Sequence, residues 1–185
     1  MICSSLNLLQ YGKFTHTIYL SESRTETIPI MYKIALFPGS FDPMTIGHED
    51  IVRRALPLFD RMIIGIGHNS SKNTLFSLDQ RLSWINSIFA DLSNVEVASY
   101  EGLTVDFCEE KGVQYILRGL RTSPDFQFER QVAQLNYQMK QVDTVSVISH
   151  PEYAHISATI VREIYSNNGD ISPFVPRPIA QSINR

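Results

Sequence analysis

The sequence has little cysteine, no long apolar run and no excess of basic residues. Its 185 residues include only two cysteines, Cys3 and Cys108, which lie far apart and form no CxxC pair. This spacing argues against a disulfide framework and against a zinc site, and it is typical of a protein from a reducing cytoplasm. No apolar run approaches the roughly 18 residues that a membrane-spanning helix needs. We therefore expect a cytoplasmic protein with no membrane partner.

The charge balance is slightly acidic, with 16 Lys and Arg residues against 19 Asp and Glu residues and a pI of about 5.9. This balance argues against a nucleic-acid partner held by a broad basic surface, but it leaves room for a small basic pocket for phosphates. The sequence shows no Ser-His-Asp arrangement, no carboxylate pair and no cysteine nucleophile. Phosphoryl or nucleotidyl transfer is therefore favoured over acyl transfer and glycoside hydrolysis.

The first 30 residues differ from the rest of the chain. They are rich in Ser and Thr, follow neither a helical nor a strand period, and lack the basic start and apolar stretch of a signal peptide. Met31 stands just before the first convincing strand pattern. We predict that residues 1–30 are a leader, either disordered or part of an over-extended reading frame, and that residues 31–185 form a single domain.

After Met31, apolar runs alternate with amphipathic patterns. Strands are predicted at residues 33–37, 62–67, 95–100, 115–117 and 144–148. Helices are predicted at residues 48–59, 77–90, 104–111, 123–140 and 157–167, the last closed by Gly169. This order predicts an α/β fold, a Rossmann-like doubly wound domain with a five-stranded parallel sheet and right-handed crossovers. Ligands of such folds bind beyond the carboxyl ends of the strands.

The segment from Phe37 to His48 reads FPGSFDPMTIGH and joins the first predicted strand to the first predicted helix. Its Gly47-His48 pair lies where that helix begins. The free N–H groups and the positive dipole end of such a helix attract anions, phosphate above all. The imidazole of His48 can donate a further hydrogen bond to a phosphate oxygen. The segment therefore predicts a phosphate-binding loop.

The loops that follow the other strands carry cationic donors, and we expect all of these loops to share one rim of the sheet. The donors of the rim are His48, Lys72, Arg118, Arg121 and Arg162. Without a matching set of acids, they predict a site for polyanions. A structural alternative is that Arg118 and Arg121 form ion pairs with Asp125 and Glu129.

Three motifs together resemble the phosphopantetheine adenylyltransferase family. The segment at 38–48 fits PGSFDP-x-T-x-GH, with Thr45 in the first place of the superfamily pattern (H/T)-x-G-H. Residues 118–121 read RGLR and are followed by DFQFE at 125–129, and residues 156–163 read ISATIVRE. The resemblance covers residues 31 to 170. It implies transfer of AMP from ATP to 4′-phosphopantetheine, which yields 3′-dephospho-coenzyme A and pyrophosphate.

The resemblance also implies roles for individual residues. His48 and Lys72 would be catalytic and would neutralise charge on the α-phosphate. ATP would contact Ser40, Phe41, His48, Gly119, Leu120, Arg121, Glu129, Tyr153, Ala154, His155, Ile156, Ser157, Ala158 and Thr159. The acceptor would contact Ser40, Lys72, Thr104 and Arg118. Mg²⁺ would arrive with ATP, without a dedicated set of protein ligands, and the protein would be a homo-oligomer, a hexamer by family resemblance.

Three positions depart from the family pattern. Phe128 stands where the family often has Tyr, Ala158 interrupts a serine run, and Thr104 replaces a frequent Met, which makes one wall of the acceptor pocket smaller and more polar. Two alternatives stay open at this point. One is a sister nucleotidylyltransferase, such as a nicotinate-nucleotide adenylyltransferase or a cytidylyltransferase, and the other is a non-catalytic nucleotide-binding module.

Overall fold

The structure is a computed structural model that describes residues 16–20, 24–28, 32–68 and 73–183. The chain divides into two compact units, Met1–Tyr32 and Lys33–Arg185. In the first unit, strands β1 (His16–Leu20) and β2 (Arg24–Ile28) pair antiparallel, where the sequence predicted no strand. The predicted leader at 1–30 falls for the most part outside the described residues, and it stays a prediction.

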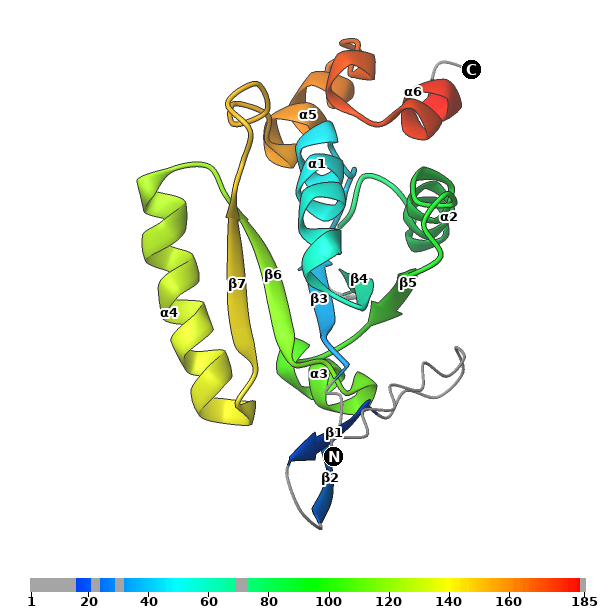
Figure 1. Ribbon diagram of the computed structural model, residues 1–185. Coiled ribbons are helices and arrows are strands. Elements are labelled where there is room, and N and C mark those ends of the chain that lie inside the picture. Colours follow the sequence, from blue (N-terminus) through cyan, green and yellow to red (C-terminus); the bar gives the residue numbers. More distant parts are fainter. Residues whose placement is uncertain (1–15, 21–23, 29–31, 69–72, 184–185) are drawn as a thin grey trace. The chain divides into compact units, whose positions relative to one another are not determined.

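The second unit is built on a five-stranded parallel sheet, as the alternation predicted (Figure 1). Its strands are β3 (Ile34–Gly39), β4 (Arg61–Gly67), β5 (Val95–Tyr100), β6 (Tyr115–Leu120) and β7 (Asp143–Ile148). Their order is β5-β4-β3-β6-β7. The direction of the strand order therefore reverses between β3 and β6, and this switch point is where doubly wound folds bind ligands.

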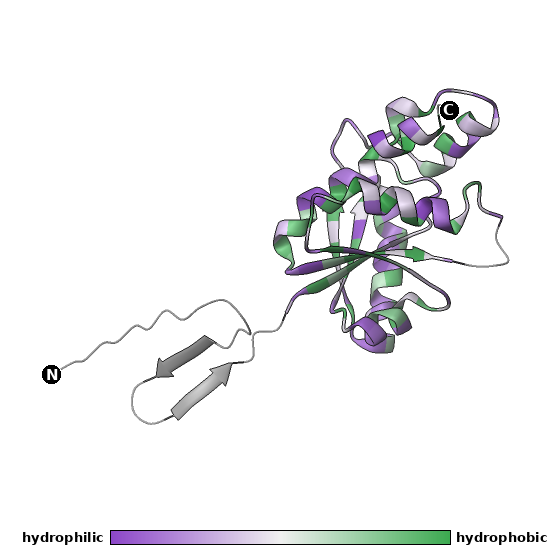
Figure 2. Cartoon of the chain, turned by 90° about the vertical axis from the view of Figure 1, so that its right-hand side faces the viewer, coloured by the Kyte–Doolittle hydropathy of each residue, from purple (hydrophilic) through white to green (hydrophobic). Residues whose placement is uncertain are grey.

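Helices cover both faces of this sheet (Figure 2). They are α1 (Ile46–Ala55), α2 (Leu78–Ile88), α3 (Thr104–Lys111), α4 (Ser123–Lys140), α5 (Ala158–Ser166) and α6 (Arg177–Ile183), with short 3-10 turns η1 (Leu56–Leu58) and η2 (Ser172–Phe174). The side chains of β3 alternate between two buried clusters. Ala35 and Phe37 belong to the cluster that includes residues of α1, α2, α5 and α6, whereas Leu36 belongs to the cluster that includes residues of α3. The sheet is apolar on both faces because both are covered.

The end of β6 and the turn after α5 differ from the prediction, and each difference has a physical reason. Residues 118–120 were expected in a loop, but β6 continues to Leu120 because these residues pair with residues 146–148 of β7. The turn after α5 places Asn168, not Gly169, in the left-handed region, with φ of 61°. Gly169 instead allows close packing, since an added Cβ would lie 2.6 Å from Cγ2 of Ile164.

Candidate active site

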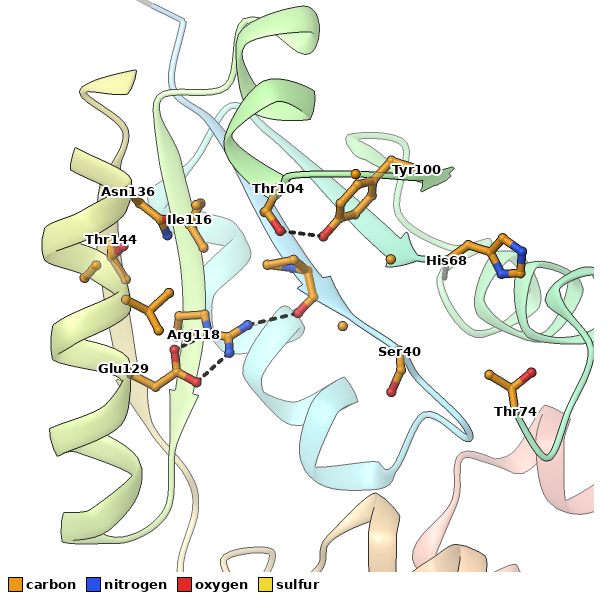
Figure 3. A pocket seen from close by; sticks show the side chains of 16 residues that line it. Ser40, His68, Thr74, Tyr100, Thr104, Ile116, Arg118, Glu129, Asn136 and Thr144 are labelled. Carbon is orange, nitrogen blue, oxygen red and sulfur yellow. Dashed lines mark hydrogen bonds and ion pairs between the residues drawn. The ribbon is translucent and has the colours of Figure 1, made fainter. Parts of the chain in front are cut away.

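Two adjoining cavities lie at the carboxyl ends of the strands, around the switch point. The first, of about 350 Å³, is lined by the β3–α1 loop, the end of β6 and the segment that leads into α5. The second, of about 400 Å³, is lined by the ends of β3 to β6 and by α4 (Figure 3). The residues that line both cavities are Pro38, Gly39, Ser40, Arg118 and Glu129. The shared border means that ligands in the two cavities would meet near Ser40 and Arg118.

His48 faces the first cavity from the first turn of α1, and Thr45 determines its tautomer. The backbone N–H of Thr45 donates to Nδ1 of His48 at 3.0 Å, and the backbone N–H of His48 donates to Oγ1 of Thr45 at 3.4 Å. Because a backbone N–H can only donate, Nδ1 is an acceptor and the proton of the neutral ring lies on Nε2. Nε2 has no hydrogen-bond partner among the described residues. Its N–H is therefore free to bind a ligand oxygen.

The surroundings of His48 keep its ring neutral. Burial, and then the positive charges of Arg121 and Arg118, lower the pKa of His48 from 6.5 to about 4. Each effect disfavours the imidazolium form, the first by removing water and the others by repulsion. In the ligand-free protein at neutral pH, His48 is thus a hydrogen-bond donor rather than a cation.

Phe41 closes one side of the His48 ring. The two rings meet edge to face, with centroids 5.5 Å apart and an interplanar angle of 88°. Phe41 is only 3% exposed and has a φ of 44°, in the left-handed region that a bulky residue rarely adopts. Gly39 is needed beneath it, since an added Cβ would lie 2.8 Å from Cζ of Phe41. Backbone strain is therefore present beside the imidazole, as is common at functional sites.

Arg118 ties together the elements on either side of the switch point. Its guanidinium makes a bidentate ion pair with Glu129 of α4, with Nε 2.7 Å from Oε2, and it also donates to the carbonyl of Pro38 in β3 at 3.2 Å. The side chains are 28% and 14% exposed. The ion-paired alternative is thus confirmed for Arg118, and the expectation that it lacks an acidic partner was wrong.

The other two arginines of the first cavity differ from each other. Arg121 pairs with Asp125, with Nε 3.1 Å from Oδ2, so the ion-paired alternative is confirmed for it as well. Arg162 donates to the carbonyl of Asp42 at 2.8 Å and to Oγ1 of Thr159 at 3.1 Å. In the described part of the chain it forms no ion pair, because neither partner is a carboxylate. Arg162 therefore supplies the least neutralised positive charge of this cavity.

The second cavity has a polar wall. Oη of Tyr100 and Oγ1 of Thr104 are 2.9 Å apart, and the Tyr100 ring stacks on Phe107 at 4.7 Å between centroids. Two buried atoms of the lining, Oγ1 of Thr144 and Nδ1 of His68, have no hydrogen-bond partner in the described part of the chain. Buried polar atoms are normally paired. This lining suits a ligand that carries amide or hydroxyl groups.

Most of the predicted site residues come together at this rim. The first cavity is lined by Ser40, Phe41, His48, Gly119, Arg121, Glu129, Tyr153, Ile156, Ser157, Ala158 and Thr159. The second is lined by Ser40, Thr104 and Arg118. Leu120, Ala154 and His155 line neither cavity. Lys72 lies outside the described residues, so its predicted role stays a prediction.

Two buried charged residues behind the loop were missed from the sequence. Both carboxylate oxygens of Asp42 accept backbone N–H groups, from Leu75 at 2.8 Å and from Phe76 at 2.9 Å. Arg81 of α2 is 1% exposed and donates to the carbonyl of Ser40 at 2.7 Å. A signal was present, because Arg81 falls three residues after Leu78, on the apolar face of its helix.

The chain is similar in sequence to known proteins. Residues 36–164 match the cytidylyltransferase-like family model. The phosphopantetheine adenylyltransferase of Cytophaga hutchinsonii is 49% identical over 150 residues, which cover 80% of this chain and 100% of that protein. That of Christiangramia forsetii is 48% identical and covers 78% of this chain and 95% of the relative.

A solved bifunctional NMN adenylyltransferase/ADP ribose pyrophosphatase from Francisella tularensis is similar in fold, with a TM-score of 0.56 at 20% identity. The match covers 78% of this chain and 45% of that longer chain. At this level of identity the likeness shows the fold alone.

Proposed function

Because the chain belongs to the phosphopantetheine adenylyltransferase family, it is an adenylyltransferase of coenzyme A biosynthesis, and we propose that its two cavities hold the two substrates. ATP occupies the first cavity, where two helix N-termini, His48 and Arg162 face the same space. 4′-Phosphopantetheine occupies the second, whose polar wall suits the amide groups of the pantetheine arm. The observation that carries this proposal is the shared border at Ser40 and Arg118, where the reacting phosphates would meet.

The chemistry proposed for this border needs no general base. The acceptor phosphate attacks the α-phosphorus of ATP, and pyrophosphate leaves from the opposite side. The second pKa of a phosphate monoester is about 6, so the nucleophile is mostly ionised at neutral pH. The protein then contributes positioning and stabilisation of the charge that develops on the α-phosphate.

His48 is proposed to donate its Nε2–H to an oxygen of the α-phosphate. The Nδ1 contact with Thr45 and the Phe41 ring hold the imidazole in one orientation before the substrate arrives. A donor that is already oriented stabilises the transition state without reorganisation at the moment of reaction. Lys72, outside the described residues, is proposed as a second catalytic donor, on the resemblance alone.

Mg²⁺ is proposed to reach the site bound to the phosphates of ATP. Glu129, which lines the first cavity, is engaged by Arg118, and Asp125 is engaged by the lining residue Arg121. Among the described residues no group of three or more His, Cys, Asp and Glu side chains is placed to hold a metal ion. The residues present do not fit a dedicated protein-bound magnesium site, and the roles assigned here to side chains do not depend on one.

A homo-oligomer is proposed, and the apolar side chains that α4 leaves exposed support it. The large apolar side chains of that helix that are about half exposed or more are Phe126, Phe128, Leu135, Tyr137 and Met139. Ile148, on the edge strand β7, is 73% exposed. Exposed apolar groups of this size usually mark an interface. The hexameric number rests on family resemblance, and sedimentation of the wild type beside a Phe128→Glu variant would test both points.

No helix in the described ranges is long and apolar enough to cross a membrane. A cytoplasmic location is proposed on the cysteine usage of the sequence.

The decisive experiment supplies purified protein with ATP, Mg²⁺ and 4′-phosphopantetheine. Pyrophosphate release is measured, and dephospho-coenzyme A is identified by mass. Nicotinate mononucleotide serves as the control acceptor. We expect product with 4′-phosphopantetheine as acceptor and none with nicotinate mononucleotide. Product with nicotinate mononucleotide and none with 4′-phosphopantetheine would refute the acceptor assignment.

A further inference from the structure

Arg81 is a charged residue enclosed by the core, and its hydrogen bonds join the loop before α2 to the loop between β3 and α1. Its Nε donates to the carbonyls of Phe76 and Ser77 at 3.1 and 3.3 Å, and one terminal nitrogen donates to the carbonyl of Ser40 at 2.7 Å. The other terminal nitrogen is buried and has no hydrogen-bond partner among the residues that the structure describes. Such a group destabilises a fold, since its hydration is lost and not replaced. Buried polar atoms are normally hydrogen-bonded, and departures from this rule are expected at functional sites.

The contact with Ser40 acts directly on the strained residue of the site. The carbonyl of Ser40 belongs to the peptide unit that precedes Phe41, and the orientation of that unit determines the φ angle of Phe41. A short hydrogen bond to the carbonyl therefore restrains the left-handed conformation of Phe41. Without the restraint, a bulky residue would relax toward negative φ.

Asp42, directly after Phe41, is anchored from two further directions. Its carboxylate accepts the backbone N–H groups of Leu75 and Phe76, and its carbonyl accepts from Arg162. The segment on both sides of Phe41 is thus held by α2, by the loop before α2 and by α5. Arg81 is the anchor on the N-terminal side of the strained residue.

We propose that Arg81 is a positioning residue which, through the Ser40 carbonyl, holds Phe41 in the conformation that keeps its ring against His48. The chain of contacts runs from Arg81 to Ser40, from Ser40 to Phe41 by the backbone, and from Phe41 to the imidazole by ring packing. Its consequence for turnover rests on the proposed function, in which His48 contacts ATP. Its consequence for the environment of His48 does not depend on any substrate.

The test compares Arg81→Lys with Arg53→Lys. Lysine has a single terminal nitrogen and cannot reproduce the fork that joins the Phe76 and Ser40 carbonyls. Arg53 of α1 is a matched control, because its guanidinium also donates to a backbone carbonyl, that of Ile88, and does not line either cavity. Two quantities are measured in each variant: the steady-state constants, and the pKa of His48 by NMR of the ligand-free protein.

Arg81→Lys is expected to lower kcat about 10²-fold with little change in the KM for ATP, as for a small misplacement of a catalytic group. The pKa of His48 should rise from about 4 toward 6.5, because water then reaches the ring. The charged groups that face His48, Arg118 and Arg121, are unchanged in the variant, so a rise reports loss of burial. Arg53→Lys should leave both quantities as in the wild type.

A folded Arg81→Lys protein with an unchanged His48 pKa would overturn the proposal, whatever happens to turnover. Phe41→Gly keeps the experiment decisive if Arg81→Lys does not fold, since it removes the ring and leaves Arg81 in place. In Phe41→Gly the pKa of His48 should rise in the same way, and an unchanged value would equally overturn the proposal. Inactivity of the wild type would refute the proposed function, but it would leave these NMR results interpretable.

Discussion

His48 should stay neutral at a pH at which an ordinary histidine is mostly protonated. Its pKa is lowered from 6.5 to about 4. At pH 5.5, a histidine of ordinary pKa is about 90% protonated, whereas His48 should be about 3% protonated. NMR of the imidazole nitrogens in the ligand-free protein would show Nδ1 unprotonated and Nε2 protonated at pH 5.5.

The lowered pKa of His48 should also make the free energy of unfolding depend on pH. Because the folded-state pKa lies below the unfolded-state value, the unfolded chain binds a proton first as the pH falls through 6.5. The free energy of unfolding therefore decreases between pH 6.5 and about 4, and His48 adds no pH dependence above that window. The decrease due to His48 is at most about 3.5 kcal/mol, from roughly 1.4 kcal/mol for each pKa unit.

Urea denaturation at pH 7.5 and at pH 5, for the wild type and for His48→Gln, measures this contribution. The difference in stability between the two pH values should be smaller in His48→Gln, since glutamine does not titrate. His150→Gln, the same substitution at a side chain that is 50% exposed, provides the matched control. A His48 that titrates near 6.5, or that is protonated at Nδ1, would refute the reasoning from burial and from the Thr45 contact.

Three further predictions concern the two cavities. His48→Ala should lower turnover by about 10²–10³-fold in a pyrophosphate-release assay, as expected on removal of one transition-state donor; near-normal turnover would exclude its catalytic role. Glu129→Gln breaks the bidentate pair with Arg118 and should lower the free energy of unfolding by about 1–3 kcal/mol in urea, while Glu109→Gln, at an exposed pair on α3, should change it by less than about 1 kcal/mol. Thr104→Val deletes the hydroxyl that contacts Tyr100 and should raise the KM for 4′-phosphopantetheine about fivefold without raising the KM for ATP; an equal rise in both would contradict the separate cavities.

The sequence predicted those features that depend on neighbouring residues. The alternation of strands and helices and the position of His48 at the start of a helix both follow from local patterns. Because parallel strands end at one edge, the clustering of the loops at one rim could be inferred as well. The extension of β6 to Leu120 was missed, since it depends on pairing with a strand far along the chain.

What the sequence alone determined is therefore the order of elements, the family motifs and the chemistry available at the rim. Only the tertiary structure decided how that chemistry is distributed, because it depends on distances between residues far apart in sequence. Glu129 neutralises Arg118 across the switch point, Phe41 and Thr45 hold the His48 ring in one orientation, and Arg81 reaches the Ser40 carbonyl from the core. Burial and long-range pairing determine these roles, and a local pattern records neither quantity.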